Sequence, residues 1–153
     1  MPLQALTSEE IATFLARQRI VRVAFHTAAE RYLVPLGYTW QGGALCGAMA
    51  EGRKTRLARE DPRIAFQVDD TLEAGLWEWT SVSGEGKLEW VEEPREAEVI
   101  ERRMAEAWTD APQWLAEEWK ARQDGGEVAC FRIRPHHLTG CRSVPPEAMR
   151  GNG

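Results

Sequence analysis

The chain has 153 residues, of which 43% are hydrophobic and 28% are charged, as expected of a folded protein with a single core and not of a disordered chain. Its formal net charge of −5 argues against the basic surface on which general nucleic-acid binding depends. No apolar run approaches the roughly 20 residues needed to span a bilayer, and residues 1–18 lack the pattern of a signal peptide, so we expect a cytoplasmic protein that binds neither membranes nor nucleic acid.

The first residues predict a helix followed by a strand. Thr7 and Glu10 have the spacing of a capping box, in which each side chain bonds the backbone N–H of the other residue. Apolar residues at helical spacing then continue to about Gln18. From Ile20 the period changes to two, which indicates a half-buried strand.

Residues 32–49 predict two further strands joined by a tight turn. The first is YLVPLGYTW (32–40), where Pro35 favours an edge or an irregular position because proline cannot donate to a strand ladder. QGG (41–43) predicts the turn, and ALCGAM (44–49) the strand that completes a hairpin.

Residues 51–70 predict a short helix and then a fourth strand. The helix begins at Gly52-Arg53-Lys54 and ends before Asp61, because a residue that precedes proline disfavours the helical conformation. Two cations at a helix start are unexpected, since the helix macrodipole is positive there.

A long fifth strand is predicted from about Leu76 to Val91. Between residues 81 and 90 its even positions are apolar or small and its odd positions are polar. The glycines at 84 and 86 lie on the inner face, which indicates a tightly coiled strand of a small barrel.

Two helices follow, at 92–108 and up to about residue 122, and the last strand begins at Val128. Residues 1–144 are expected to form one domain and residues 145–153 a disordered tail. Because the strands do not alternate regularly with crossover helices, we expect a mainly β, α+β protein with a small antiparallel barrel and not a doubly wound parallel sheet.

Four stretches of this sequence resemble the FMN-binding split-barrel family of pyridoxamine 5′-phosphate oxidase-like proteins. They are YLVPLGY (32–38), EGRKTRLAREDPRIAFQVD (51–69), WTSVSGEGKLEWVEEP (79–94) and FRIRPHHLTG (131–140), and the likeness extends from about residue 8 to residue 142. The resemblance implies a small antiparallel split β-barrel with flanking helices. It also implies a homodimer that holds FMN at its interface and acts as an oxidoreductase on a small-molecule substrate.

The resemblance assigns the phosphate of FMN to Gly52, Arg53 and Lys54. The chemistry agrees, because arginine can hold two phosphate oxygens in a fork and lysine adds a point charge. The free N–H groups at a helix start add to the attraction, so a phosphate would explain why two cations stand there.

For the flavin ring the resemblance assigns Val34, Pro35 and Leu36, mainly through their backbone groups. It also assigns a polar contact with the cofactor to Ser81, which lies on the outward, polar face of the fifth strand.

One cofactor-binding pair departs from the family pattern. Relatives commonly have an aromatic residue or histidine followed by serine or threonine on the third strand, where this chain has Gly47 and Ala48. The lost hydrogen bonds, each worth about 0.5–1.5 kcal/mol, would weaken FMN binding or leave room for a bulkier ligand. Trp77 or Trp79 could provide stacking area instead, or only seal the dimer contact.

The sequence predicts no catalytic residue and no metal site. His136 and His137 are adjacent, and neighbours on a regular strand point to opposite faces, so they are not expected to chelate a metal. Cys46 and Cys141 have no partner in a recognisable nucleophile motif. The absence of an acid–base set is consistent with a flavoprotein, because the flavin itself performs the redox step.

Three functions are therefore considered. The first is an FMN-dependent oxidoreductase. The second is a deazaflavin (F420)-dependent reductase, which the small residues at 47 and 48 would favour by leaving space. The third is a non-catalytic barrel that has lost FMN and binds haem or another small ligand.

Overall fold

The structure is a computed structural model that describes residues 2–147. Within that range the strands are β1 (Leu3–Ala5), β2 (Ile20–His26), β3 (Arg31–Gly37), β4 (Thr39–Gln41), β5 (Ala44–Ala50), β6 (Arg63–Asp69), β7 (Thr80–Trp90) and β8 (Val128–Ser143). The helices are α1 (Ser8–Arg17), α2 (Arg53–Glu60), α3 (Thr71–Ala74), α4 (Pro94–Ala107) and α5 (Gln113–Asp124).

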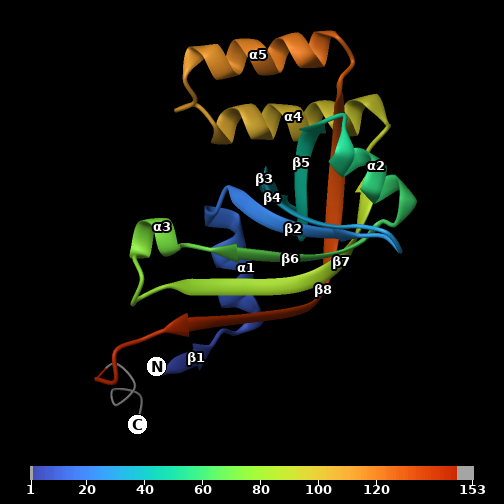
Figure 1. The fold of residues 1–153 in the computed structure, drawn as a ribbon. Helices are drawn as coiled ribbons and strands as arrows, with labels where there is room; N and C mark the ends of the chain where they lie inside the picture. The colour runs from blue at the N-terminus through green and yellow to red at the C-terminus, as the bar shows by residue number, and fades with distance from the viewer. Residues whose placement is uncertain (1, 148–153) are drawn as a thin grey trace.

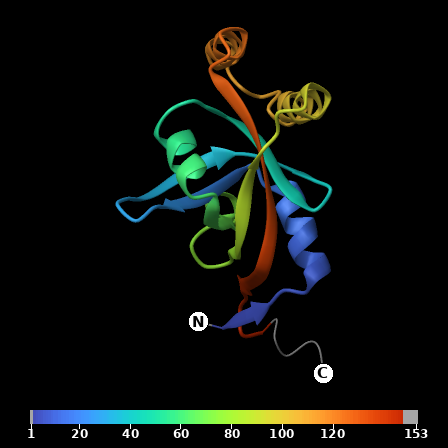
Figure 2. The same cartoon turned by 90° about the vertical axis from the view of Figure 1, so that its right-hand side faces the viewer.

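All strands belong to one antiparallel sheet, in the order β3-β2-β6-β7-β8-β5-β4, with β1 paired to the end of β8. The sheet curls into a half-barrel (Figures 1 and 2). Its two ends approach each other where β3 meets β5: a Cβ placed on Gly47 would lie 2.7 Å from the carbonyl oxygen of Gly37. The ladder is not continued across this contact, so the barrel is split between β3 and β5. The predicted α+β split barrel is confirmed.

The inner face of the curled sheet forms the main core. Alternate residues of the strands point into it, and its largest fully buried side chains include Phe25, Tyr38, Leu45 and Phe131. The glycines predicted to lie inside β7 do so, because a Cβ on Gly84 would lie 2.8 Å from the Phe66 ring. At this position any side chain would displace a core aromatic ring.

The helices cover parts of the sheet that its curl leaves open. Helix α1 has the predicted capping box and lies at one end of the barrel, where the Tyr38 hydroxyl donates a 2.7 Å hydrogen bond to the Leu15 carbonyl. Helix α4 packs Ile100 onto the outer side of β5 and β8, in a second cluster with Cys46 and Cys130. Helix α5 lies beyond α4 (Figure 1).

The structure corrects several predicted boundaries. The predicted strand 32–40 is divided at Tyr38: β3 pairs with β2, and β4 forms the predicted hairpin with β5 through Gly42 and Gly43, which both have positive φ. The Tyr38 N–H still bonds the carbonyl of Arg19, next to the last β2–β3 pair, and from Thr39 the chain pairs with β5 instead. Pro35 lies on an edge strand, as predicted.

Other corrections concern the chain ends and β7. The predicted strand from Leu76 begins only at Thr80, because the short helix α3 and a loop precede it. Strand β1 was not predicted, and β8 continues to Ser143. Of the predicted disordered tail, residues 145–147 lie outside any strand or helix, and the remainder lies outside the described residues. Within the described part of the chain, no helix combines the length and hydrophobicity needed to cross a membrane.

Candidate functional site

The start of helix α2 is anchored and open on one side. The buried Thr55 hydroxyl donates to the Gly52 carbonyl and lies 2.9 Å from the Gly52 N–H, which fixes the first turn. Gly52 itself is exposed, and a Cβ placed on it would meet no atom within 4 Å. The first backbone N–H groups of a helix have no intrahelical acceptor. An anion can therefore approach the helix start closely.

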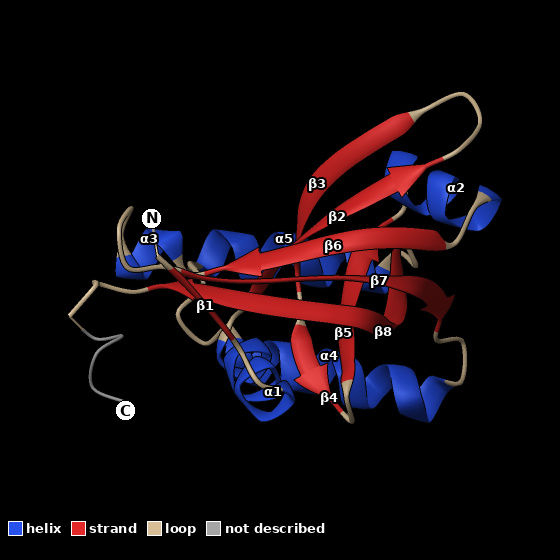
Figure 3. Ribbon diagram, turned by 90° about the horizontal axis from the view of Figure 1, so that it is seen from below, coloured by secondary structure: helices blue, strands red, loops and turns tan. Residues whose placement is uncertain are grey.

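Arg53 is held in place by the turn between β2 and β3, which lies beside α2 (Figure 3). Its Nε donates to the Glu30 carboxylate at 3.1 Å, and its guanidinium lies 4.1 Å from the centre of the Tyr32 ring. Arg56 donates to the other Glu30 oxygen at 2.9 Å. These hydrogen bonds, that of Arg56 above all, lower the pKa of Glu30, so this carboxylate is ionised at neutral pH and positions both arginines.

The region around the helix start has an excess of positive charge. Arg53, Lys54 and Arg56 face two carboxylates, Glu30 and, at 4.0 Å from Arg56, Glu60, which leaves one formal positive charge uncompensated among these five side chains. Arg59, in the last turn, does not add to them, because it pairs with Glu51 at 2.7 Å and lowers the pKa of that carboxyl to about 2. A phosphate monoester has the charge to balance this excess.

The predicted ring-binding segment lies on β3, an end strand of the sheet. The Leu36 side chain is buried in the core and Val34 is half-buried against it, whereas Pro35 is exposed. In the described chain β3 pairs only with β2, so its other edge presents backbone groups that no strand occupies. This agrees with a ligand contact made by backbone atoms and not by these apolar side chains.

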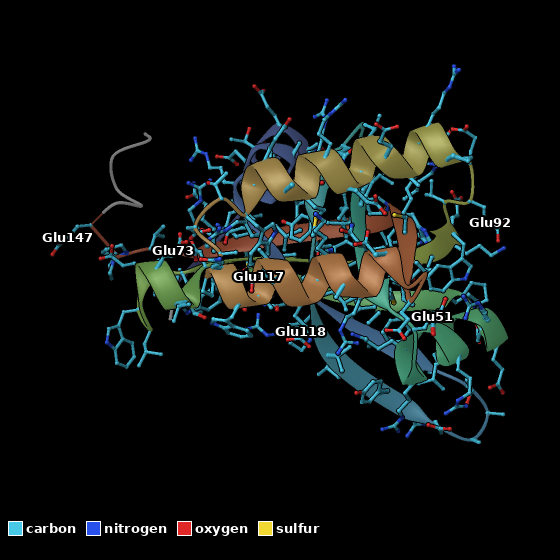
Figure 4. The ribbon with its side chains drawn as sticks, turned by 90° about the horizontal axis from the view of Figure 1, so that it is seen from above. Glu51, Glu73, Glu92, Glu117, Glu118 and Glu147 are labelled. Atoms are coloured by element: carbon cyan, nitrogen blue, oxygen red, sulfur yellow. The ribbon has the colours of Figure 1, made fainter. Side chains whose placement is uncertain are left out.

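Ser81 does not lie beside α2 in a single chain. It is near the start of β7, where its hydroxyl accepts a 3.0 Å hydrogen bond from the Gln67 amide. Figure 1 places α2 and α3 at opposite ends of β6, and Figure 4 likewise shows Glu51, before α2, and Glu73, in α3, at opposite ends of the molecule. The structure therefore groups the start of β3 with α2. It places Ser81 away from α2 and beside Gln67, whose ladder partner Arg22 lies opposite Pro35.

The expectation that Gly47 leaves space for a ligand is wrong. A Cβ at this buried position would lie 2.7 Å from the Gly37 carbonyl oxygen and 2.9 Å from the Phe131 ring, so the volume is already filled. Ala48 points the other way and packs with the cluster beneath α4, which contains Ala97 and Met104. The assignment of Gly47 and Ala48 to the cofactor site stays a prediction, and the space that favoured a deazaflavin is not present at Gly47.

Sequence reasoning missed Glu30, Tyr32 and Arg56. No local motif marks them, because their contacts with α2 depend on how the β2–β3 hairpin folds back on the helix. The only signal was the short spacing between Tyr32 and the predicted ring-binding segment.

The cysteines beneath α4 are not activated. Burial raises the pKa of Cys46, and burial next to Glu101 raises the pKa of Cys130 to about 12. Cys130 lines a cleft of about 360 Å³ together with Trp90 and Arg59. At neutral pH both thiols are protonated and are poor nucleophiles.

The curled sheet, split at β3 and β5, and the basic helix start beside its open edge together define a split-barrel protein. The family model of pyridoxamine 5′-phosphate oxidase matches residues 7–142, and the chain belongs to this family. A comparison of its sequence with curated proteins finds no match.

Solved structures confirm the fold. An FAD-binding protein from Mesorhizobium loti is 22% identical, with a TM-score of 0.75 over 94% of this chain and 100% of that one. The FAD-binding protein from Mycobacterium smegmatis is 19% identical, with a TM-score of 0.60 over 92% and 100%. The haem storage protein HutZ from Vibrio cholerae is 14% identical, with a TM-score of 0.68 over 86% and 92%.

Proposed function

We propose that this chain binds FMN, with the phosphate at the start of α2 and the ring along the open edge of β3, and acts as an oxidoreductase on a small-molecule substrate. The observation that supports this most is the cation excess of Arg53, Lys54 and Arg56 at an open helix start. Membership of the family and the likeness to two FAD-binding proteins favour a flavin.

In this proposal the residues of this chain bind the flavin and orient it. A bound flavin supplies the electron-transfer chemistry. Arg53 is preorganised by Glu30 and Tyr32, so little side-chain entropy is lost when it meets a phosphate oxygen. Lys54 adds a second cation whose amine is free to rotate toward a phosphate oxygen. The backbone of residues 34–36 positions the ring.

We first predict that the purified protein binds FMN more tightly than riboflavin, by roughly 100-fold or more, because riboflavin lacks the phosphate and so forms no charge-assisted hydrogen bonds at α2. Titrations of the protein with FMN, FAD and riboflavin, followed by flavin fluorescence, measure this directly. F420 and haem, followed by absorbance, test the alternatives.

Equal affinity for FMN and riboflavin would show that the start of α2 does not bind the phosphate. Failure of all three flavins to bind, with saturable binding of haem or F420, would replace the proposal by one of the alternatives. Tighter binding of FAD than of FMN would retain the flavin and correct its identity.

We further propose that the protein is a homodimer. Leu72, Leu76 and Trp77, around α3, are 99%, 73% and 78% exposed, an apolar group that a partner would remove from water. A cofactor site that includes both α2 and Ser81 also forms more readily between two chains than within one.

If the protein is a homodimer, we expect its apparent molecular mass in sedimentation equilibrium to rise with protein concentration. Replacing Leu76 and Trp77 by serine is expected to weaken self-association by at least tenfold, because burying two large apolar side chains contributes about 1.5–3 kcal/mol each. The matched control replaces Trp114 and Leu115, exposed apolar neighbours on α5, in the same way. A purely monomeric native protein at tens of micromolar, or an equal effect of the two double variants, would contradict the proposed interface.

A further inference from the structure

Strand β8 contains an irregularity that changes the direction of two side chains. Ser83 of β7 lies opposite Thr139, and Glu85 lies opposite His136, so His137 and Leu138 together oppose the single residue Gly84. This is a β-bulge, which inserts one extra residue into one of two paired strands.

The bulge keeps both histidines on the outer face. His137 has a positive φ of 52°, a conformation that is uncommon for residues other than glycine. Leu138 points inward instead, where its side chain lies over Gly84 and packs against the core. His136 shares the outer face with Glu85, its partner across the ladder. The prediction that adjacent histidines point to opposite faces is therefore wrong here, because it assumed a regular strand.

The three side chains converge. The His136 Nε2 atom lies 3.9 Å from a Glu85 carboxylate oxygen, and the two imidazole rings meet edge to face with centroids 4.9 Å apart. One potential ligand atom from each of Glu85, His136 and His137 lies within 4.8 Å of the others. All three residues are exposed, so water and ions reach them.

These distances are close to those of a bound divalent cation. Ligand atoms at about 2.0–2.1 Å from a tetrahedral Zn²⁺ lie roughly 3.4 Å from one another. Rotations of the exposed side chains that bring the ligand atoms together by up to about 1.4 Å produce this arrangement. Two imidazoles and one carboxylate suit Zn²⁺ and similar transition-metal ions, and leave a fourth position for water.

The surroundings allow such an ion. Ala65 of β6, opposite Glu85, is exposed and small, so it does not cover the carboxylate. The cations one step further along the same face are Lys87 and its ladder partners Arg134 and Arg63. The Arg134 guanidinium lies 3.7 Å from Glu89, which offsets its charge.

We infer that Glu85, His136 and His137 form a three-ligand binding site for a divalent transition-metal cation such as Zn²⁺, created by the bulge in β8 and separate from the proposed flavin site. The convergence of two adjacent histidines on one carboxylate is the observation from which this follows. The site does not require the flavin, so it stands whether or not FMN binds.

The chain offers an internal control for the experiment. It contains only three histidines, and the third, His26, also lies near a carboxylate, with its Nδ1 3.3 Å from Asp61. Imidazole nitrogen NMR of the metal-free protein, titrated with ZnCl₂, reports each ring separately. We expect the His136 and His137 signals to shift together and saturate at one Zn²⁺ per chain, with His26 unchanged at that ratio.

Variants of the ligands test the same site by competition with a chromophoric chelator. Glu85→Gln, His136→Gln and His137→Asn are each expected to reduce Zn²⁺ affinity at least tenfold, whereas His26→Gln leaves it unchanged. Asparagine is chosen at 137 because it tolerates a positive φ, so the bulge is retained. Thermal unfolding of each variant verifies the fold.

The inference is overturned if His26 responds to Zn²⁺ as strongly as the other two rings, or if no ring shifts at one equivalent. It is also overturned if His137→Asn binds Zn²⁺ as tightly as the native chain. An unchanged affinity in Glu85→Gln would reduce the site to a histidine pair and reject the three-ligand assignment.

Discussion

Replacing Arg53 and Lys54 together by alanine is expected to weaken FMN binding by 100-fold or more and to leave riboflavin binding unchanged. Each charge-assisted hydrogen bond to the phosphate is worth about 1.5–3 kcal/mol, which corresponds to roughly 10- to 150-fold for each residue. Riboflavin has the same ring and no phosphate, so the ratio of the two dissociation constants isolates the α2 end of the site. Fluorescence titrations of both ligands measure it.

The matched control for this double variant is on α5. Lys120 and Arg122 are a pair of cations near the end of α5, of which Lys120 is exposed and Arg122 half-buried. Arg122 is bonded to one carboxylate, Glu118, at 3.2 Å, much as Arg53 is bonded to Glu30. Their replacement by alanine makes the same change in net charge and is expected to alter FMN affinity less than twofold. A similar loss in both double variants would show only general electrostatic attraction. A parallel loss of riboflavin binding would show damage to the barrel.

The second large effect is expected at Gly47. Replacement by alanine should reduce the free energy of unfolding by about 1–3 kcal/mol, because the new Cβ meets both a backbone oxygen and an aromatic ring of the core. The backbone oxygen belongs to Gly37, at the point where β3 meets β5, so relief requires the two ends of the split barrel to separate. Chemical denaturation measures the change.

Gly125→Ala is the matched control for this substitution. Gly125 ends α5 with a φ of −79°, and a Cβ there would meet its nearest neighbour at an ordinary contact distance of 3.4 Å. This variant is expected to be neutral or slightly stabilising. If Gly47→Ala unfolds at the same denaturant concentration as the native chain, the barrel has room for a side chain at this position. The small residue at 47 would then again favour a larger ligand such as a deazaflavin.

The local patterns of the sequence were sufficient for most of the elements. Three features depend only on residues that are neighbours in the chain: the capping box of α1, the alternation in β6 and β7, and the end of α2 before Asp61. They can therefore be predicted without knowledge of the tertiary structure. The short helix α3 and the strand β1 were missed, because elements of three or four residues have too few positions to show a period.

The candidate site was predicted only in part, for a related reason. Gly52-Arg53-Lys54 is a contiguous motif, and its position at a helix start follows from the local sequence. Glu30 and Tyr32 reach it from a hairpin more than 20 residues earlier, and no spacing rule connects them with α2. Gly47 was misread because the absence of a side chain looks the same in a sequence whether the space is empty or filled by Phe131.

The sequence by itself therefore determined the strand and helix pattern, the split-barrel family and the basic start of α2, all of which depend on the spacing of residues along the chain. Only the tertiary structure decided which residues lie next to one another and in which direction their side chains point. It placed Glu30 on Arg53, filled the space beside Gly47, separated Ser81 from α2 and turned His136 and His137 to the same side. Each of these depends on strand register and on the curl of the sheet, which arise from contacts between residues distant in the chain.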